Sequence, residues 1–159
     1  MNKVTNGEGN NPSRDSWQTP QWLFDKLNEQ YGFEFDCCAS QNNAKCEKYS
    51  NNFESVNNVH PVAWMNPPFS KAAEMFTHFF TIIRQGVAIY RCDNMETDIW
   101  QDIIFPNVDW IFIPKRRIKY EGQPGKGGRF PSALIGLNMP MPEGLDGTLL
   151  VVYHENDYN

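Results

Sequence analysis

The chain has 159 residues, of which 40% are hydrophobic and 21% charged, which suits one buried core and excludes a disordered chain. The apolar runs fall far short of the roughly 20 residues that a membrane-spanning helix needs, so a membrane protein is excluded. The net charge of −5 is unevenly spread. Residues 114–129 hold six basic residues and one acidic residue, which leaves −10 for the remainder. An acidic protein with one basic segment is expected to contact a polyanion there.

The cysteines and the N-terminus indicate the compartment. Four cysteines stand at positions 37, 38, 46 and 92, with neither CxxC spacing nor a nearby histidine pair, so we expect no bound metal. The N-terminal residues include no apolar stretch of the kind found in a secretory signal. A protein of the reducing cytoplasm, without a membrane partner, is predicted.

The first predicted element is a helix near the N-terminus. Residues 1–16 are rich in Asn, Gly, Ser and Pro, and we expect them to form a flexible tail before a single domain over residues 17–159. Thr19 is a typical N-cap residue, and Pro20 suits the first helical position. Apolar side chains then recur at helical spacing, which predicts a helix over about residues 20–30.

Two short strands and a second helix follow. Alternating apolar residues predict a strand over residues 33–36, and residues 62–65 form another short apolar run. Ser70 can cap a helix whose apolar side chains continue at helical spacing up to Gly86. This is the clearest helical pattern in the chain.

The second half of the chain is richer in strands. Its predicted elements are strands over 87–90, 110–113, 132–137 and 148–153, and a short helix over 97–104. The basic segment lies between the strands predicted at 110–113 and 132–137. Strands that alternate with helices, followed by a strand pair, predict an α/β fold with a mostly parallel sheet and an antiparallel edge strand.

The tetrapeptide from Asn66 to Phe69, Asn-Pro-Pro-Phe, stands directly after a predicted strand and before a predicted helix, where open α/β sheets bind ligands. It suits the alkylation of a planar, conjugated amine. The side-chain oxygen of Asn66 and a backbone carbonyl of the Pro67-Pro68 turn can each accept one amine proton, which localises the nitrogen lone pair. The ring of Phe69 can stack against a flipped-out base.

Several short motifs, in this order, resemble the phage-type DNA N-6-adenine methyltransferases (Dam-like). They are Trp17-Gln18-Thr19-Pro20, Phe35-Asp36-Cys37-Cys38-Ala39-Ser40, Asn43-Ala44-Lys45-Cys46, Trp64-Met65-Asn66-Pro67-Pro68-Phe69-Ser70 and Phe130-Pro131-Ser132-Ala133. The resemblance spans about residues 17–137. It implies a Rossmann-like, S-adenosylmethionine-dependent methyltransferase fold. It also implies a DNA partner and a bacterial cytoplasm, with a phage or prophage as the source.

The resemblance also implies the site residues. The catalytic residues are Asn66, Pro67, Pro68 and Phe69. The cofactor-binding residues are Trp17, Thr19, Pro20, Asp36, Cys38, Ala39, Ser40 and Asn66. A helix start at Thr19-Pro20 offers free N–H groups to the carboxylate of the cofactor. Asp36 can accept a hydrogen bond from the ammonium group of the cofactor or from a hydroxyl of its ribose. Trp17 either stacks on the adenine of the cofactor or packs against the first helix.

Two features depart from the wider methyltransferase pattern. No glycine-rich loop follows the strand that ends at Asp36, and no acid stands clearly where the ribose would bind, with Glu54 as the only candidate. DNA contacts are assigned to the cations of the basic segment, with Arg117 as the base reader. These cations are Lys115, Arg116, Arg117, Lys119, Lys126 and Arg129.

The predicted function is methyl transfer from S-adenosylmethionine to the exocyclic N6 amine of adenine in double-stranded DNA. One alternative is N5-glutamine methylation of a protein, because related NPPY motifs serve that planar nitrogen too. Another is a catalytically silent nucleic-acid-binding or anti-restriction module. The basic segment favours DNA over a protein substrate, and the intact tetrapeptide favours an active enzyme.

Overall fold

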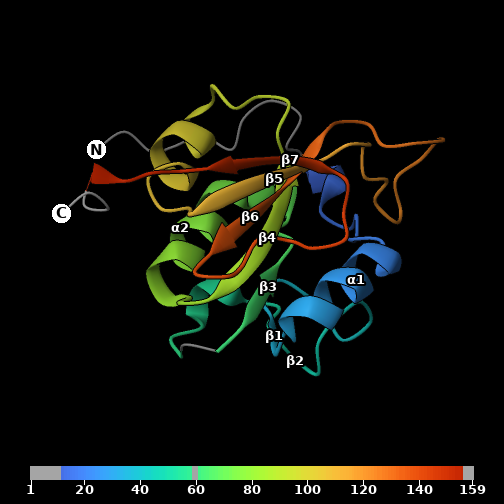
Figure 1. Ribbon diagram of the computed structural model, residues 1–159. Coiled ribbons are helices and arrows are strands. Elements are labelled where there is room, and N and C mark those ends of the chain that lie inside the picture. The colour runs from blue at the N-terminus through green and yellow to red at the C-terminus, as the bar shows by residue number, and fades with distance from the viewer. Residues whose placement is uncertain (1–11, 59–60, 156–159) are drawn as a thin grey trace.

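The computed structural model describes residues 12–58 and 61–155 (Figure 1). The helices are η1 Pro12–Arg14, α1 Gln21–Tyr31, η2 Phe53–Ser55, η3 Phe69–Lys71, α2 Ala72–Ile82 and η4 Ile99–Ile104. The strands are β1 Phe35–Asp36, β2 Lys48–Tyr49, β3 Ala63–Met65, β4 Gly86–Arg91, β5 Trp110–Pro114, β6 Ser132–Leu137 and β7 Gly147–Val151. No helix among the described residues is long and apolar enough to cross a membrane.

All seven strands belong to one sheet, in the order β2-β1-β3-β4-β6-β5-β7. Strands β2, β1, β3 and β4 are mutually parallel. Strand β6 is antiparallel to both of its neighbours, β4 and β5, and β7 is antiparallel to β5. The fold is therefore mixed α/β, with a parallel half and an antiparallel half.

The prediction of a mostly parallel sheet with an antiparallel edge strand holds only for β2, β1, β3 and β4, because the three pairings among β4, β6, β5 and β7 are antiparallel. An antiparallel edge strand is present, because β7 lies at the end of the sheet. The last two strands were expected to pair with each other, yet β5 lies between β6 and β7. Strand β6 is instead an interior strand, and its residues from Ser132 to Gly136 are buried. Strands β6 and β7 follow each other in the sequence but are not paired in the sheet. Because β6 lies between β4 and β5, both of its edges are paired and its residues are buried.

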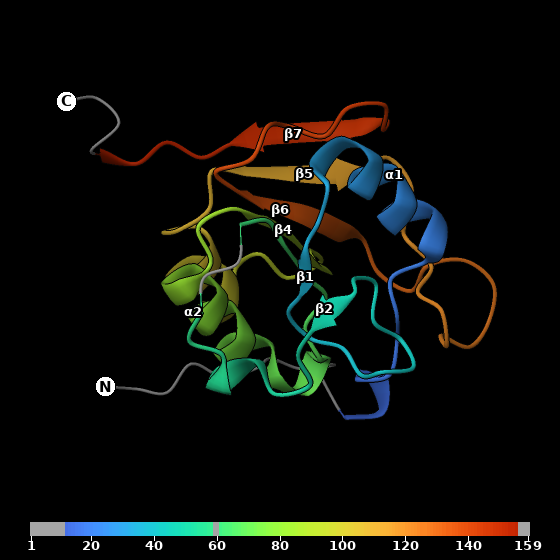
Figure 2. The same ribbon diagram turned by 90° about the horizontal axis from the view of Figure 1, so that it is seen from below.

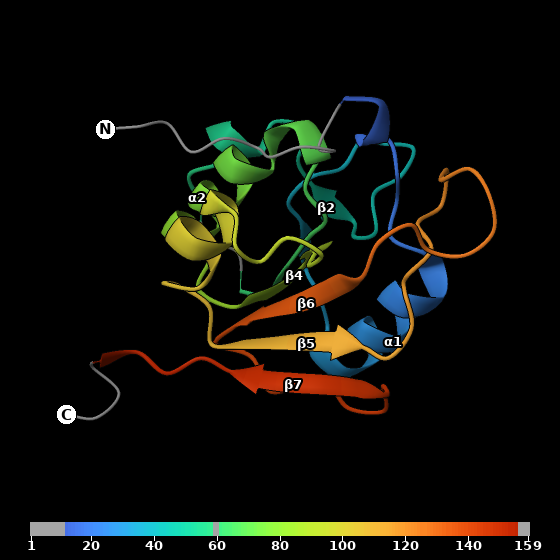
Figure 3. The same cartoon turned by 90° about the horizontal axis from the view of Figure 1, so that it is seen from above.

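Helices α1 and α2 cover opposite faces of the sheet. Trp64 of β3 is paired in register with Val87 of β4, so these two side chains lie on the same face of the sheet. Tyr90 is three residues further along β4, and because successive side chains of a strand alternate between faces, Tyr90 lies on the opposite face. The ring of Trp64 contacts Phe24 of α1, whereas the ring of Tyr90 contacts Phe76 of α2. Figures 2 and 3 show the two helices on either side of the strands.

The helix boundaries follow local chemistry. The first helix begins at Gln21 with Pro20 as its N-cap, so the prediction that Thr19 caps it is wrong. Gly32 ends the helix in the left-handed conformation, with φ 65°, which favours glycine. The second helix ends at Ile82, before the predicted limit, and Lys71 rather than Ser70 is its N-cap.

Two further elements differ from expectation. The short helix predicted over residues 97–104 is a six-residue π-helix, η4. Strand β2 was not predicted, because Lys48 and Tyr49 are both exposed and carry no apolar pattern.

The structured part of the chain starts before Trp17, since η1 and Asp15 lie in the segment expected to be a flexible tail. The rest of that expected tail, residues 1–11, lies outside the described residues.

Candidate active site

A cavity of about 280 Å³ lies where β1 and β3 end. Asp36 is the last residue of β1, and Asn66 directly follows β3. Both line the cavity, at the carboxyl ends of parallel strands, where open α/β sheets bind ligands. Of the residues assigned to the cofactor from the sequence, those that line it are Trp17, Thr19, Asp36, Cys38, Ala39, Ser40 and Asn66.

Asp36 is a buried carboxylate at the wall of this cavity. Its side chain accepts hydrogen bonds from the backbone N–H of Lys45, at 2.9 Å, and of Cys38, at 3.3 Å. Burial raises the pKa of Asp36 to about 6, and these two hydrogen bonds oppose the shift. Asp36 thus fixes the turn that follows β1 and also presents its carboxyl group to the cavity.

Asn66 is oriented by a contact with the N-terminal segment. Its Nδ2 donates to the backbone carbonyl of Trp17 at 3.5 Å. Among the described residues, Oδ1 of Asn66 has no hydrogen-bond donor. In the turn that follows, the carbonyl of Pro68 accepts from Lys71, whereas that of Pro67 has no donor within the described chain. Two acceptors of the turn are therefore unengaged among the described residues: Asn66 Oδ1, on a residue that lines the cavity, and the carbonyl of Pro67, which is buried and does not line it.

Thr19 is a buried residue with an unsatisfied hydroxyl. It is 1% exposed, it lines the cavity, and its Oγ1 has no hydrogen-bond partner among the described residues. A buried hydroxyl without a partner is unfavourable, so a polar ligand atom in the cavity would satisfy it.

Pro20 lies differently from the expectation. It is buried and does not line the cavity, so its assignment to the cofactor is not supported by its position. The helix start was expected to hold free N–H groups, but the N–H of Gln21 donates to the side chain of Glu121 at 3.1 Å. A residue 100 positions away in the sequence occupies this group, and no local pattern predicts that.

Trp17 and Phe69 belong to one aromatic cluster. Trp17 is half-buried, lines the cavity and has its ring centroid 6.0 Å from that of Phe69. Phe69 is 2% exposed and also contacts Tyr90, Tyr120 and Phe130. The expectation that Phe69 faces an extruded base disagrees with this burial. In the structure its ring packs in the core beneath Trp17.

Comparison with known proteins identifies the family. The family model of the DNA N-6-adenine-methyltransferases (Dam) matches residues 7–128, more than half of the chain. The chain belongs to this DNA N-6-adenine-methyltransferase family. No curated protein matches it significantly.

One segment that lines the cavity in this Dam-family chain, residues 51–54, was largely not predicted from the sequence. After β2, the chain turns back and contributes Asn51, Asn52, Phe53 and Glu54. Helix η2 begins at Phe53, which is buried, whereas Glu54 is exposed. The short, exposed strand β2 gave no pattern that would have placed this segment. Glu54, the candidate ribose acid, does line the cavity. The other residues not foreseen there are Asp15, Gln18, Asn43, Lys45, Trp64, Lys71 and Met75.

The cysteines are all free thiols. Burial raises the pKa of Cys46 to about 12 and that of Cys92 to about 11, and it also raises the pKa of Cys37 and Cys38. The thiols are therefore neutral near pH 7 and weakly nucleophilic. Within the described residues, no group of three or more His, Cys, Asp or Glu side chains is placed to hold a metal ion.

The basic segment of this Dam-family chain, residues 114–129, is more ordered than its glycines suggest. Ile118, Tyr120 and Gln123 are buried, and Glu121 forms a two-way backbone bridge with Gln18. The four glycines of this segment predict a flexible loop, but these contacts show that its middle packs against the rest of the domain. The six cations assigned to DNA are all exposed, and none of them lines the cavity.

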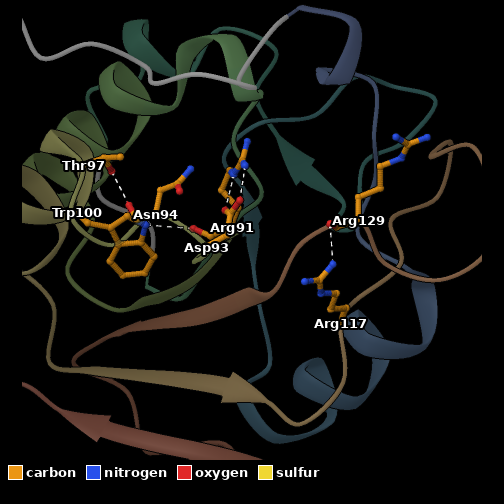
Figure 4. Close-up of polar contacts among 7 residues, drawn as sticks. All are labelled: Arg91, Asp93, Asn94, Thr97, Trp100, Arg117 and Arg129. Carbon is orange, nitrogen blue, oxygen red and sulfur yellow. Dashed lines mark hydrogen bonds and ion pairs between the residues drawn. The ribbon is translucent and has the colours of Figure 1, made fainter.

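Two of these cations also hold the loop together. Arg117 donates from Nη1 to the carbonyl of Arg129 at 2.9 Å (Figure 4), and Lys119 donates to the carbonyl of Gly125. This engagement of Arg117 gives it a structural role in the loop, beside the base-reading role that the sequence suggested.

Proposed function

We propose that this protein transfers a methyl group from S-adenosylmethionine to the exocyclic N6 amine of adenine in double-stranded DNA. The observation that carries the proposal is the placement of Asn66. It follows a buried strand, its amide nitrogen is engaged by Trp17, and its oxygen has no donor among the described residues. The family supports a DNA adenine substrate, and one domain over residues 17–159, with a Rossmann-like methyltransferase sheet, is part of the proposal.

The cavity fits the cofactor chemically. S-adenosylmethionine carries an ammonium group, a carboxylate, ribose hydroxyls and an adenine ring. Asp36 and Glu54 supply carboxylates for ammonium or hydroxyl groups, and Thr19 supplies a buried hydroxyl that lacks a partner among the described residues. Phe53 and Met75 supply apolar surface for a ring. Cys38 and Ala39 are small enough to let a ligand approach the backbone.

The tetrapeptide would activate the target amine without a general base. Bound S-adenosylmethionine supplies a methyl group on a cationic sulfur. That methyl carbon would serve as the electrophile for the adenine N6, and the sulfur would leave as a neutral thioether that keeps the bonding electron pair. Asn66 Oδ1 and the Pro67 carbonyl each accept an N–H of the amine, which reduces conjugation of its lone pair with the ring. The surplus proton then passes from nitrogen to water.

Methyl transfer with labelled cofactor tests this function. The full chain is incubated with duplexes that contain or lack adenine, and the nucleosides are then separated. We expect label in N6-methyladenine from the adenine-containing duplex and none from the other. Label found only in added protein would favour glutamine methylation. DNA binding without any transfer would favour a silent binding module.

A further inference from the structure

Two arginines, Arg14 and Arg91, lie over rings of the aromatic cluster beside the cavity. The guanidinium of Arg14 lies 5.2 Å from the ring centroid of Trp17 and 5.8 Å from that of Phe130. The guanidinium of Arg91 lies over the same Phe130 ring, at 4.9 Å. Arg129 directly precedes Phe130. The pKa of Arg14 is lowered by partial burial and then by the positive charges of Arg91 and Arg129, whereas the negative charge of Asp93 opposes this shift.

The arginine cluster is built on rigid supports. Arg91 ends β4, and its side chain makes a two-point ion pair with Asp93, with Nε–Oδ1 2.7 Å and Nη2–Oδ2 2.5 Å (Figure 4). The backbone carbonyl of Arg91 accepts from Trp100 Nε1 at 3.1 Å. On the other loop, Arg117 holds the carbonyl of Arg129. The guanidinium of Arg91 is thus held in place, whereas for Arg129 the backbone is held, and a preorganised group loses little entropy when it binds an anion.

The charges of the arginine cluster are incompletely balanced. Asp93 pairs with Arg91, whereas Arg14 and Arg129 have no ion-pair partner within the described part of the chain. Arginines held close together against their mutual repulsion create a site that an anion stabilises. The planar guanidinium group suits the oxygens of a phosphate in particular.

The cluster adjoins the candidate active site directly. Arg14 lies over the ring of Trp17, and Trp17 both lines the cavity and accepts the hydrogen bond from Asn66. Arg91 ends β4, the strand next to β3, which leads into Asn66. An anion bound by Arg14 and Arg91 would therefore lie close to the group that occupies the mouth of the cavity.

We propose that Arg14, Arg91 and Arg129 form a clamp for the backbone phosphate next to the target adenine. This inference rests on the proposed function. It assigns Arg129 and the two arginines outside the basic segment a local role that differs from that of the other exposed cations of the segment. Those cations supply general attraction along the duplex, whereas the clamp positions the one nucleotide that enters the site. Arg14 and Arg91 are thus positioning residues, outside the basic segment that the sequence emphasised.

Neutralising single phosphates tests the clamp. A duplex with one adenine that the wild-type protein methylates is prepared in a series, each member carrying one methylphosphonate near that adenine. Wild type should lose affinity by about tenfold at one or two adjacent positions, the effect of one charge-assisted contact. Arg14→Gln should bind the unmodified duplex about tenfold more weakly than wild type. A methylphosphonate at the sensitive positions should not weaken its binding any further.

Matched controls separate positioning from folding. Arg84→Gln changes an exposed arginine before β4, at the end of that strand opposite Arg91, and it should show the wild-type methylphosphonate profile. Cofactor affinity and circular dichroism of Arg14→Gln should match wild type. If Arg14→Gln fails to fold, Arg129→Gln is expected to give the same loss of the methylphosphonate effect.

The outcomes distinguish the two proposals. If the wild-type protein methylates no duplex, the proposed function and the clamp are both overturned. If it methylates DNA but Arg14→Gln keeps wild-type affinity, or keeps the full methylphosphonate loss at every position, the clamp alone is overturned. Loss of the position-specific effect in Arg14→Gln, with its retention in Arg84→Gln, supports the clamp.

Discussion

The carboxylate of Asp15 accepts two hydrogen bonds from Ser70, one from its backbone N–H at 2.9 Å and one from its hydroxyl at 2.5 Å. Ser70 immediately follows the Asn-Pro-Pro-Phe tetrapeptide, so this pair ties the N-terminal segment to the candidate catalytic turn. Trp17, two residues after Asp15, in turn holds the Asn66 amide. The chain before α1 is therefore part of the site.

Asp15→Ala should weaken both fold and site. We expect a loss of about 1–2 kcal/mol in the free energy of unfolding, since two hydrogen bonds at an exposed carboxylate are removed. Cofactor affinity should also fall, because Asp15 and Trp17 both line the cavity. Urea denaturation and calorimetry measure the two effects. Asp102→Ala, at an exposed position of η4 outside the cavity lining, is the control, and equal behaviour of the two variants would contradict the role of Asp15.

Asn66→Ala should remove catalysis while leaving cofactor binding largely intact. Loss of one oriented acceptor is expected to cost about 3 kcal/mol of activation free energy, roughly a hundredfold in rate. Asn66→Asp keeps an oxygen acceptor and should retain more activity than Asn66→Ala. Single-turnover methyl transfer at saturating DNA measures the rates. A wild-type rate for Asn66→Ala would show that the catalytic assignment is wrong.

Phe69→Ala should act through stability. Its ring is 2% exposed and contacts four other aromatic rings, so its deletion leaves a cavity that costs about 3–5 kcal/mol. Phe69→Leu keeps much of the side-chain volume, so its free energy of unfolding should fall clearly less. Thermal and urea unfolding provide the measurement. A stable Phe69→Ala protein with specifically weakened DNA binding would instead place the ring against the base.

Asp36 should make stability depend on pH. Its pKa is raised from 3.8 to about 6 by burial. Between these values the folded protein holds a proton that the unfolded chain has lost, so the free energy of unfolding falls as pH rises. The full difference corresponds to about 3 kcal/mol. Asp36→Asn should lack this decline when unfolding is compared at about pH 4 and about pH 7.5. Parallel pH profiles of the two proteins would contradict the burial argument.

Lys115, Arg116 and Lys126 should supply salt-dependent DNA affinity. All three are exposed, and none has a hydrogen bond from its side chain to another described residue. Their joint replacement by Ala should weaken binding and flatten the plot of log affinity against log salt by about 0.9 per lost phosphate contact. Fluorescence anisotropy over a salt series measures the slope. Cofactor affinity serves as the control and should stay unchanged. An unaltered slope would mean that DNA binds elsewhere.

The sequence predicts the parts of this protein whose signals are local. Leu23, Phe24 and Leu27 mark α1 by their spacing, and all three are buried. Asn66 is found because the tetrapeptide lies between an apolar strand and an amphipathic helix. The roles of Glu121 at the start of α1 and of Asp15 beside Ser70 could not be predicted, because each joins residues at least 55 positions apart. Strand β2 was not predicted because its two residues are exposed and too few to show an alternation of apolar and polar side chains.

The interior position of β6 bears on how the chain acquires its structure during synthesis. Strands β4 and β5 are joined only through β6, residues 132–137, which is made after both. Until then each would expose an unpaired backbone edge, which favours association with other chains. The region matched by the family ends at residue 128, so a chain that ended there would hold the candidate catalytic turn yet lack the strand that joins the two halves of the sheet. We therefore expect the two halves of the sheet to join late, when β6 is made, while the outer edge of β5 stays unpaired until β7 follows.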